Sequence, residues 1–125
     1  MKRALWSAAA ITAALLLLTL DSGAADSSQM KRLVSGEVVS LYAYLAQGVQ
    51  GPEHHDVGVF QVETRGLPIA LLEDGTGTLW VAVYKGPTSA AAKLLPLMGR
   101  KVNAQGPVWS QGGVNLIEIQ VVAEQ

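Results

Sequence analysis

The stretch IALLEDGTGTLWVAVY, residues 69–84, decides how this chain is expected to fold. Its two ends are rich in aliphatic, β-branched and aromatic residues, which favour strands. The Asp74-Gly75 step between them is typical of a tight hairpin turn. The stretch therefore predicts two antiparallel strands, 69–72 and 78–84, to which the rest of the chain adds.

The segment that follows the hairpin predicts one short helix and two further strands. Residues 90–95 are good helix formers, and Pro96 is expected to end or distort the helix that they form. Residues 100–105 and 114–122 have the composition of strands, and Gly106-Pro107 is expected to begin their connection.

The segment before the hairpin is harder to assign. Residues 33–45 alternate as one long strand would, with Tyr42 and Tyr44 on the same face, and Gly36 could allow a bend or a bulge. Residues 57–65 remain ambiguous between strand and helix, because Val and Phe favour a strand and Gly58 weakens a helix.

The order of these elements predicts a mainly β fold over residues 33–125. A strand, a connection, two strands, a helix and two strands correspond to a five- to six-stranded OB-like barrel with one short helix between strands 3 and 4. A six-stranded sandwich is the alternative. We favour the barrel because its closure removes most of the exposed sheet edges.

The first 25 residues have the layout of a secretory signal peptide. A basic start precedes an apolar run at residues 4–20, and the small residues 22–25 provide a cleavage site. The alternative is a membrane anchor, but the run is short for a bilayer span and Asp21 follows it. The sequence therefore predicts a periplasmic or secreted protein, with a flexible leader at residues 26–32. We expect the protein to contact the membrane only if the signal segment is not cleaved.

The composition of the chain argues against several classes of function. Residues 26–125 carry seven Lys and Arg and nine Asp and Glu, so a general attraction to nucleic acid is not expected. The chain contains no cysteine, so the fold must be stable without disulfides. No nucleophile–base motif and no phosphate-binding loop occur, and an enzyme is therefore not expected.

An ordered series of short motifs runs from Ser35 to Val122. They are Gly36-Glu37-Val38-Val39-Ser40, Tyr44-Leu45, Gly48 with Gly51, Gly66-Leu67-Pro68, Leu71-Leu72, Gly77-Thr78-Leu79-Trp80, Gly99-Arg100-Lys101-Val102 and Gly106-Pro107-Val108. In this series the chain resembles a family of small exported bacterial proteins of the OB type, most of them uncharacterised. The resemblance implies an exported OB-like barrel.

This chain departs from the family pattern at its cysteines. The pattern contains C-Y-L and H-x-x-C-A-x-x-C-x-x-x-G-x-P, and its three cysteines correspond here to Ala43, Gly58 and Val62. The family histidine corresponds to His55, or to His54 if one residue is inserted nearby. Three thiols and a histidine would suit a soft metal, so this chain has lost any such site.

The sequence Glu53-His54-His55-Asp56 is the one cluster with the chemistry of metal ligands. Imidazoles and carboxylates can bind zinc, copper or nickel, although a specific site needs three or four ligands. The alternative is a solvated polar loop. A divalent metal is therefore a secondary hypothesis, and no other cofactor is expected.

Aromatic residues suggest a binding surface. An OB barrel could present them for stacking on sugars or bases, whereas the alternative is that they fill the core. We expect an exported, non-catalytic module that binds a small ligand or a protein partner through its aromatic residues and the loop at 48–57. Metal handling, and binding of oligosaccharide or single-stranded nucleic acid, are the alternatives. The candidate aromatic residues are Tyr42, Tyr44, Trp80, Tyr84 and Trp109.

Overall fold

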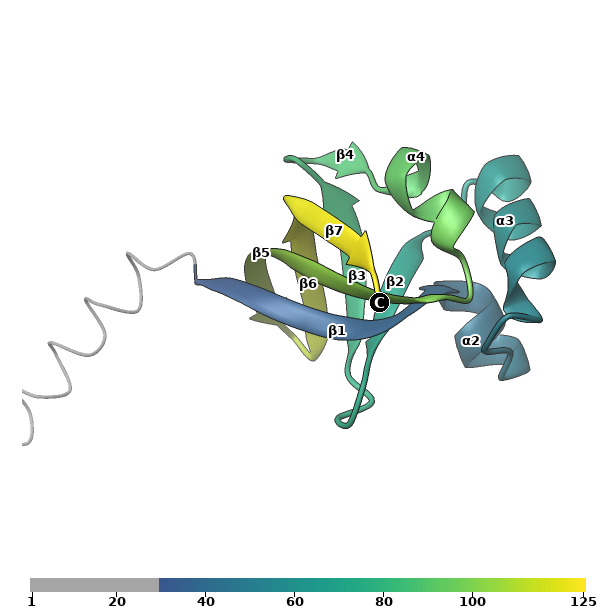
Figure 1. Cartoon of the computed structure of the whole chain (residues 1–125), viewed down its shortest axis with the longest axis horizontal. Coiled ribbons are helices and arrows are strands. Elements are labelled where there is room, and N and C mark those ends of the chain that lie inside the picture. Colours follow the sequence, from purple (N-terminus) through teal and green to yellow (C-terminus); the bar gives the residue numbers. More distant parts are fainter. Residues whose placement is uncertain (1–29) are drawn as a thin grey trace, which may run out of the picture.

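The computed structural model describes residues 30–125, and the predicted signal peptide lies outside them. These residues form a β-sheet structure with short helices (Figure 1). In chain order the elements are β1 (Lys31–Ser40), α2 (Leu41–Gln47), α3 (His54–Arg65), β2 (Ile69–Glu73), β3 (Leu79–Tyr84), β4 (Thr88–Ser89), α4 (Ala91–Leu94), the 3-10 helix η1 (Leu95–Leu97), β5 (Lys101–Gln111), β6 (Val114–Ile119) and β7 (Val121–Glu124). Within this part of the chain, no helix is long and apolar enough to cross a membrane.

Five strands close into a barrel. The pairing runs β1-β2-β3-β6-β5, and β5 pairs back with β1. The β3–β6 pair is parallel, and the other pairs are antiparallel. Two short strands extend the sheet, β4 beside β3 and β7 beside β5. The predicted OB-like barrel is confirmed, with α4 and η1 between its third and fourth strands.

The hairpin at residues 69–84 forms as predicted, with β2 antiparallel to β3. Gly36, where a bend was expected, is the position at which β1 passes from β5 to β2, since it pairs with both Val102 and Glu73. A Cβ atom there would lie 2.8 Å from the carbonyl carbon of Leu72. Only glycine lets the two backbones approach so closely.

The prediction of one strand over residues 33–45 was wrong at both ends. Pairing already begins at Lys31, in the expected leader, and the strand ends at Ser40, where α2 begins. The Ser40 Oγ accepts a hydrogen bond from the Ala43 N–H at 3.4 Å and caps the helix. Tyr42 and Tyr44 therefore do not share a strand face, because two residues differ by about 200° around a helix.

The ambiguous segment 57–65 is helical and belongs to α3. Asp56 lies in its first turn and Arg65 in its last, as the helix dipole favours, and Gly66 ends it in the left-handed region at φ 65°. Gly58 is tolerated because there is no room for a side chain. A Cβ atom there would lie 2.6 Å from Met98 Cγ and 2.8 Å from His54 Cδ2.

Two boundaries in the C-terminal half also differ from the prediction. The expected turn at Gly106-Pro107 was wrong, since β5 continues through it to Gln111. The expected strand 114–122 is interrupted at Gln120, whose N–H donates to the Gln105 carbonyl at 2.9 Å. This bend lets β6 pair with β3 and β5, while β7 continues along β5.

The core fills the barrel and extends under the helices. Val34, Leu71 and Ile117 are fully buried from the strands, and Leu94 and Met98 are fully buried beneath the helices. The helices α2 and α3 pack together at the end of the barrel where β1 ends (Figure 1). Their outer faces form the surface described next.

Candidate functional site

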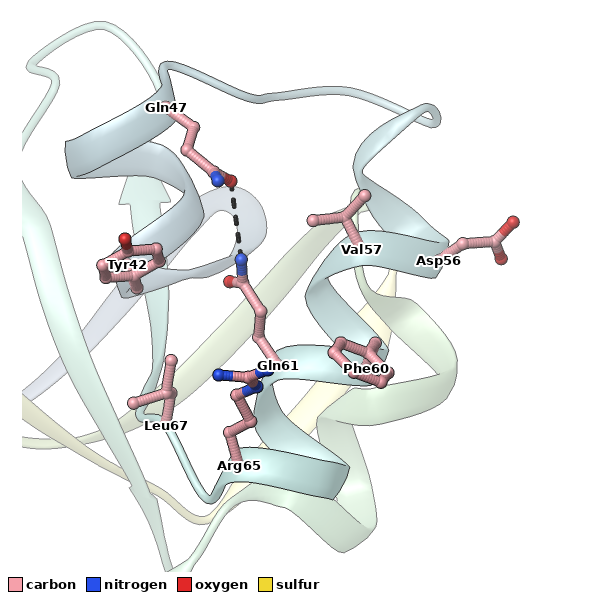
Figure 2. A pocket seen from close by; sticks show the side chains of 8 residues that line it. All are labelled: Tyr42, Gln47, Asp56, Val57, Phe60, Gln61, Arg65 and Leu67. Carbon is pink, nitrogen blue, oxygen red and sulfur yellow. Dashed lines mark hydrogen bonds between the residues drawn. The ribbon is translucent and has the colours of Figure 1, made fainter.

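A groove of about 830 Å³ runs between α2 and α3, and we call it the helix groove. Figure 2 shows Tyr42 and Leu67 on one side of it and Val57 and Phe60 on the other. The residues that line it are Tyr42, Gln47, Asp56, Val57, Phe60, Gln61, Arg65 and Leu67.

A chain of hydrogen bonds holds α2 and α3 in place on the two sides of the helix groove. The Ser40 Oγ donates to the Gln61 Oε1 at 2.6 Å, inside the protein. The Gln61 Nε2 donates to the Gln47 Oε1 at 3.4 Å across the groove (Figure 2). The cap of α2 therefore also anchors α3, and the groove is preformed.

The walls of the groove expose large apolar side chains. Tyr42 is 51% exposed and Phe60 is 53% exposed, and Val57 and the nearby Leu45 are also exposed. The Arg65 guanidinium lies 5.7 Å from the centre of the Phe60 ring, in a cation–π arrangement. An apolar patch on two adjacent helices is typical of a binding surface.

The five predicted aromatic residues do not form one stacking surface. Trp80 and Tyr84 share the inner face of β3, where Trp80 is 4% exposed and packs in the core. Trp109 lies apart in a shallow depression beside Val83 and Leu116. Tyr44 is half-buried on α2, and among the five only Tyr42 lines the helix groove.

Trp80 belongs to a cluster that stabilises the hairpin. Its Nε1–H donates to the Glu73 Oε1 at 3.2 Å, and the Arg32 guanidinium lies 5.1 Å from its ring centre and pairs with Glu73 at 3.0 Å. Thr76 donates to the same carboxylate at 2.9 Å. Partial burial raises the pKa of Glu73, but the three donors and the Arg32 charge outweigh it and hold that pKa below its ordinary value.

His54 is a structural residue. It is fully buried, its Nε2 accepts from the Ser40 N–H at 2.8 Å, and its Nδ1 therefore carries the proton and donates to the Val49 carbonyl at 2.9 Å. Both ring nitrogens are occupied, so His54 has none left for a metal.

The other members of the predicted metal cluster point elsewhere. The His55 Nδ1 donates to the Met98 carbonyl at 3.1 Å, while Glu53 and Asp56 are exposed. Within residues 30–125, no three His, Asp or Glu side chains are placed to hold one metal ion. The structure thus does not bring the predicted cluster together.

The three positions compared above with cysteines of the resembled family, Ala43, Gly58 and Val62, are all buried. His54, Gly58 and Val62 occupy successive turns on one face of α3, and Ala43 of α2 is buried. His54, rather than His55, therefore shares a face with the two α3 positions. The buried side chain of Met98 lies over Gly58.

Val57 ends the predicted binding loop 48–57, but the other groove residues of this face of α3, Phe60, Gln61 and Arg65, were not predicted from the sequence. Their spacing is that of one helical face, but Gly58 and the β-branched residues concealed this period.

Comparisons of the chain with protein-family models, with known proteins and with solved structures found no match. A function must therefore be inferred from the site itself.

Proposed function

We propose that this protein is an exported, non-catalytic binding module that holds a short apolar segment of a protein partner in the helix groove. The observation that carries the proposal is the exposure of Tyr42, Val57 and Phe60 around a preformed groove. Export is supported by the layout of residues 1–25.

The chemistry of the lining favours a protein partner over a small ligand. Tyr and Arg are enriched among the residues that dominate protein–protein binding energies, and aromatic residues are enriched at interface cores. Pockets for small ligands bury most of the ligand surface, whereas the walls of this groove are half-exposed. The lining offers one carboxylate and one guanidinium, which suit recognition rather than acid–base catalysis.

Arg65 supplies a charge at one end of the groove, whereas the Asp56 side chain points away from it (Figure 2). Val57 and Arg65 are eight residues apart on the same face of α3, a separation of about 12 Å along the helix axis. An extended segment of about four residues spans that distance. We expect one or two large apolar side chains between Tyr42 and Phe60 and a carboxylate at Arg65, which can accept two parallel hydrogen bonds.

Selection from a library of random twelve-residue peptides tests this function. The purified protein is the target, and a Phe60→Ser variant removes peptides that bind elsewhere. We expect the selected peptides to combine apolar residues with an acidic residue and to shift the amide resonances of α2 and α3. Failure to enrich any peptide, or shifts confined to the barrel strands, would overturn the proposal.

A matched pair of variants shows whether the groove itself binds. Val57→Ser and Val114→Ser each replace an exposed valine, the first in the groove and the second on β6. We expect Val57→Ser to weaken peptide binding about tenfold and Val114→Ser to leave it unchanged. Equal effects of the two would show that binding is not specific to the groove.

A further inference from the structure

A second cavity, of about 620 Å³, lies on another side of α3. It has no lining residue in common with the helix groove. Its wall carries the charged side chains of Glu37, Arg100, Lys101 and Glu124, together with the His55 ring and Pro52. We call it the Glu37 cavity.

The carboxylate of Glu37 is buried in this wall without a cation. Glu37 is 5% exposed, and its Oε2 accepts a hydrogen bond from the Gly51 N–H at 2.8 Å. Among residues 30–125, no ion pair includes Glu37. Lys101 is its direct partner in the β1–β5 register, yet the Lys101 ammonium pairs with Asp74 instead. A buried, unpaired anion is costly, and a cation that entered the cavity would offset that cost.

His55 adds a second acceptor to the same cavity. Its Nδ1 carries a proton and donates to the Met98 carbonyl at 3.1 Å, so in the neutral ring Nε2 is an acceptor. Within residues 30–125, Nε2 makes no hydrogen bond to the protein. The cavity thus combines the Glu37 carboxylate and an imidazole with the apolar surface of Pro52. Its two cations, Arg100 and Lys101, pair with other carboxylates, those of Glu124 and Asp74.

We propose that the Glu37 cavity binds a small organic molecule through a protonated amine that pairs with Glu37 and donates to His55. Two ligating side chains fall short of the three or four that a zinc site uses. A primary ammonium has three donors, which two acceptors and solvent can satisfy, and its carbon chain can lie on Pro52. This site is independent of the function proposed for the helix groove.

Three probes of the same size separate charge from shape. Butylammonium, butan-1-ol and butyrate share an apolar chain and differ in the charge of the head group. In an NMR titration of the purified protein, we expect butylammonium to shift the Gly51 amide and the His55 ring resonances. It should bind at least about tenfold more tightly than butan-1-ol, and butyrate should not bind. Equal binding of butan-1-ol, or no shift with butylammonium at about 100 mM, would overturn the proposal.

Substitution of the carboxylate provides the second test. Glu37→Gln keeps an oxygen that can accept from Gly51 but removes the charge, and we expect it to reduce butylammonium binding to the level of butan-1-ol. Glu63→Gln removes the same charge from an exposed position on α3 and should have no effect. An equal loss in both variants would overturn the proposal. Binding of zinc(II) at Glu37 and His55 without any binding of butylammonium would replace the amine site by a metal site.

Discussion

Replacing His54 by alanine is expected to destabilise the protein strongly, because this side chain joins three segments of the chain. The ring accepts from the backbone of Ser40 at the start of α2 and donates to Val49 in the loop that follows α2. It also lies against the Gly58 position within α3. Alanine removes all of these contacts at once.

The magnitude follows from the groups that lose their partners. The Ser40 N–H is buried and would be left without an acceptor, and the Val49 carbonyl would lose its donor. An unsatisfied buried polar group costs about 1–3 kcal/mol, and the lost packing of the ring adds a cavity cost. We expect the free energy of unfolding to fall by about 3–5 kcal/mol, a large fraction of the stability of a small domain.

Urea unfolding followed by circular dichroism measures this loss, with His55→Ala as the matched control. The half-buried His55 side chain makes one hydrogen bond within the described residues, to the Met98 carbonyl, so its removal should cost about 1 kcal/mol or less. A cost below about 1 kcal/mol for His54→Ala would refute the structural role. Stabilisation of the wild type by zinc that is absent in His54→Ala would refute the assignment of both ring nitrogens to protein partners.

Two further predictions concern the barrel. Gly106→Ala would place a Cβ atom 2.9 Å from the carbonyl carbon of Glu118. Because the backbone at Glu118 cannot move aside as a side chain can, we expect the free energy of unfolding in urea to fall by about 3 kcal/mol or more. Gly112→Ala, in an open turn at φ 60°, should cost about 1 kcal/mol, and an equal cost at the two positions would contradict the close approach. The pKa of Glu73 is lower in the folded protein than in the unfolded chain, so the unfolded chain takes up its proton first as the pH falls. The contribution of Glu73 to stability is therefore fully present above the ordinary glutamate pKa. It is lost as the pH falls through the lower folded-state value. Unfolding measured from pH 7 to about pH 3 should therefore show a weaker loss of stability in Glu73→Gln, and an unchanged pH profile would show that this carboxylate is not involved.

Local signals were sufficient for much of the barrel. The Asp74-Gly75 turn and its flanking apolar runs predicted the β2–β3 hairpin, and the alanine-rich segment before Pro96 predicted the short helix. These elements are specified by turn chemistry and propensity over a few residues, which a sequence displays directly. The order of elements then sufficed for the OB-like class.

The helix groove could not be predicted in the same way. Residues 41–45 alternate as a strand would, and they become helical because Ser40 caps α2 and connects it to His54 and Gln61. The same contacts decide that Tyr42 is exposed in the groove, while barrel closure decides that Trp80 is buried. Each of these outcomes depends on partners far away in the chain.

The sequence by itself thus determined the hairpin, the short helix and the barrel class, and it predicted export from residues 1–25. Only the tertiary structure decided that His54 is a buried connector, that the aromatic residues are divided between core and surface, and that Glu37 lines a cavity. The physical reason is that propensity and turn geometry act over a few residues. Burial and hydrogen bonding depend on which distant segments the fold brings together.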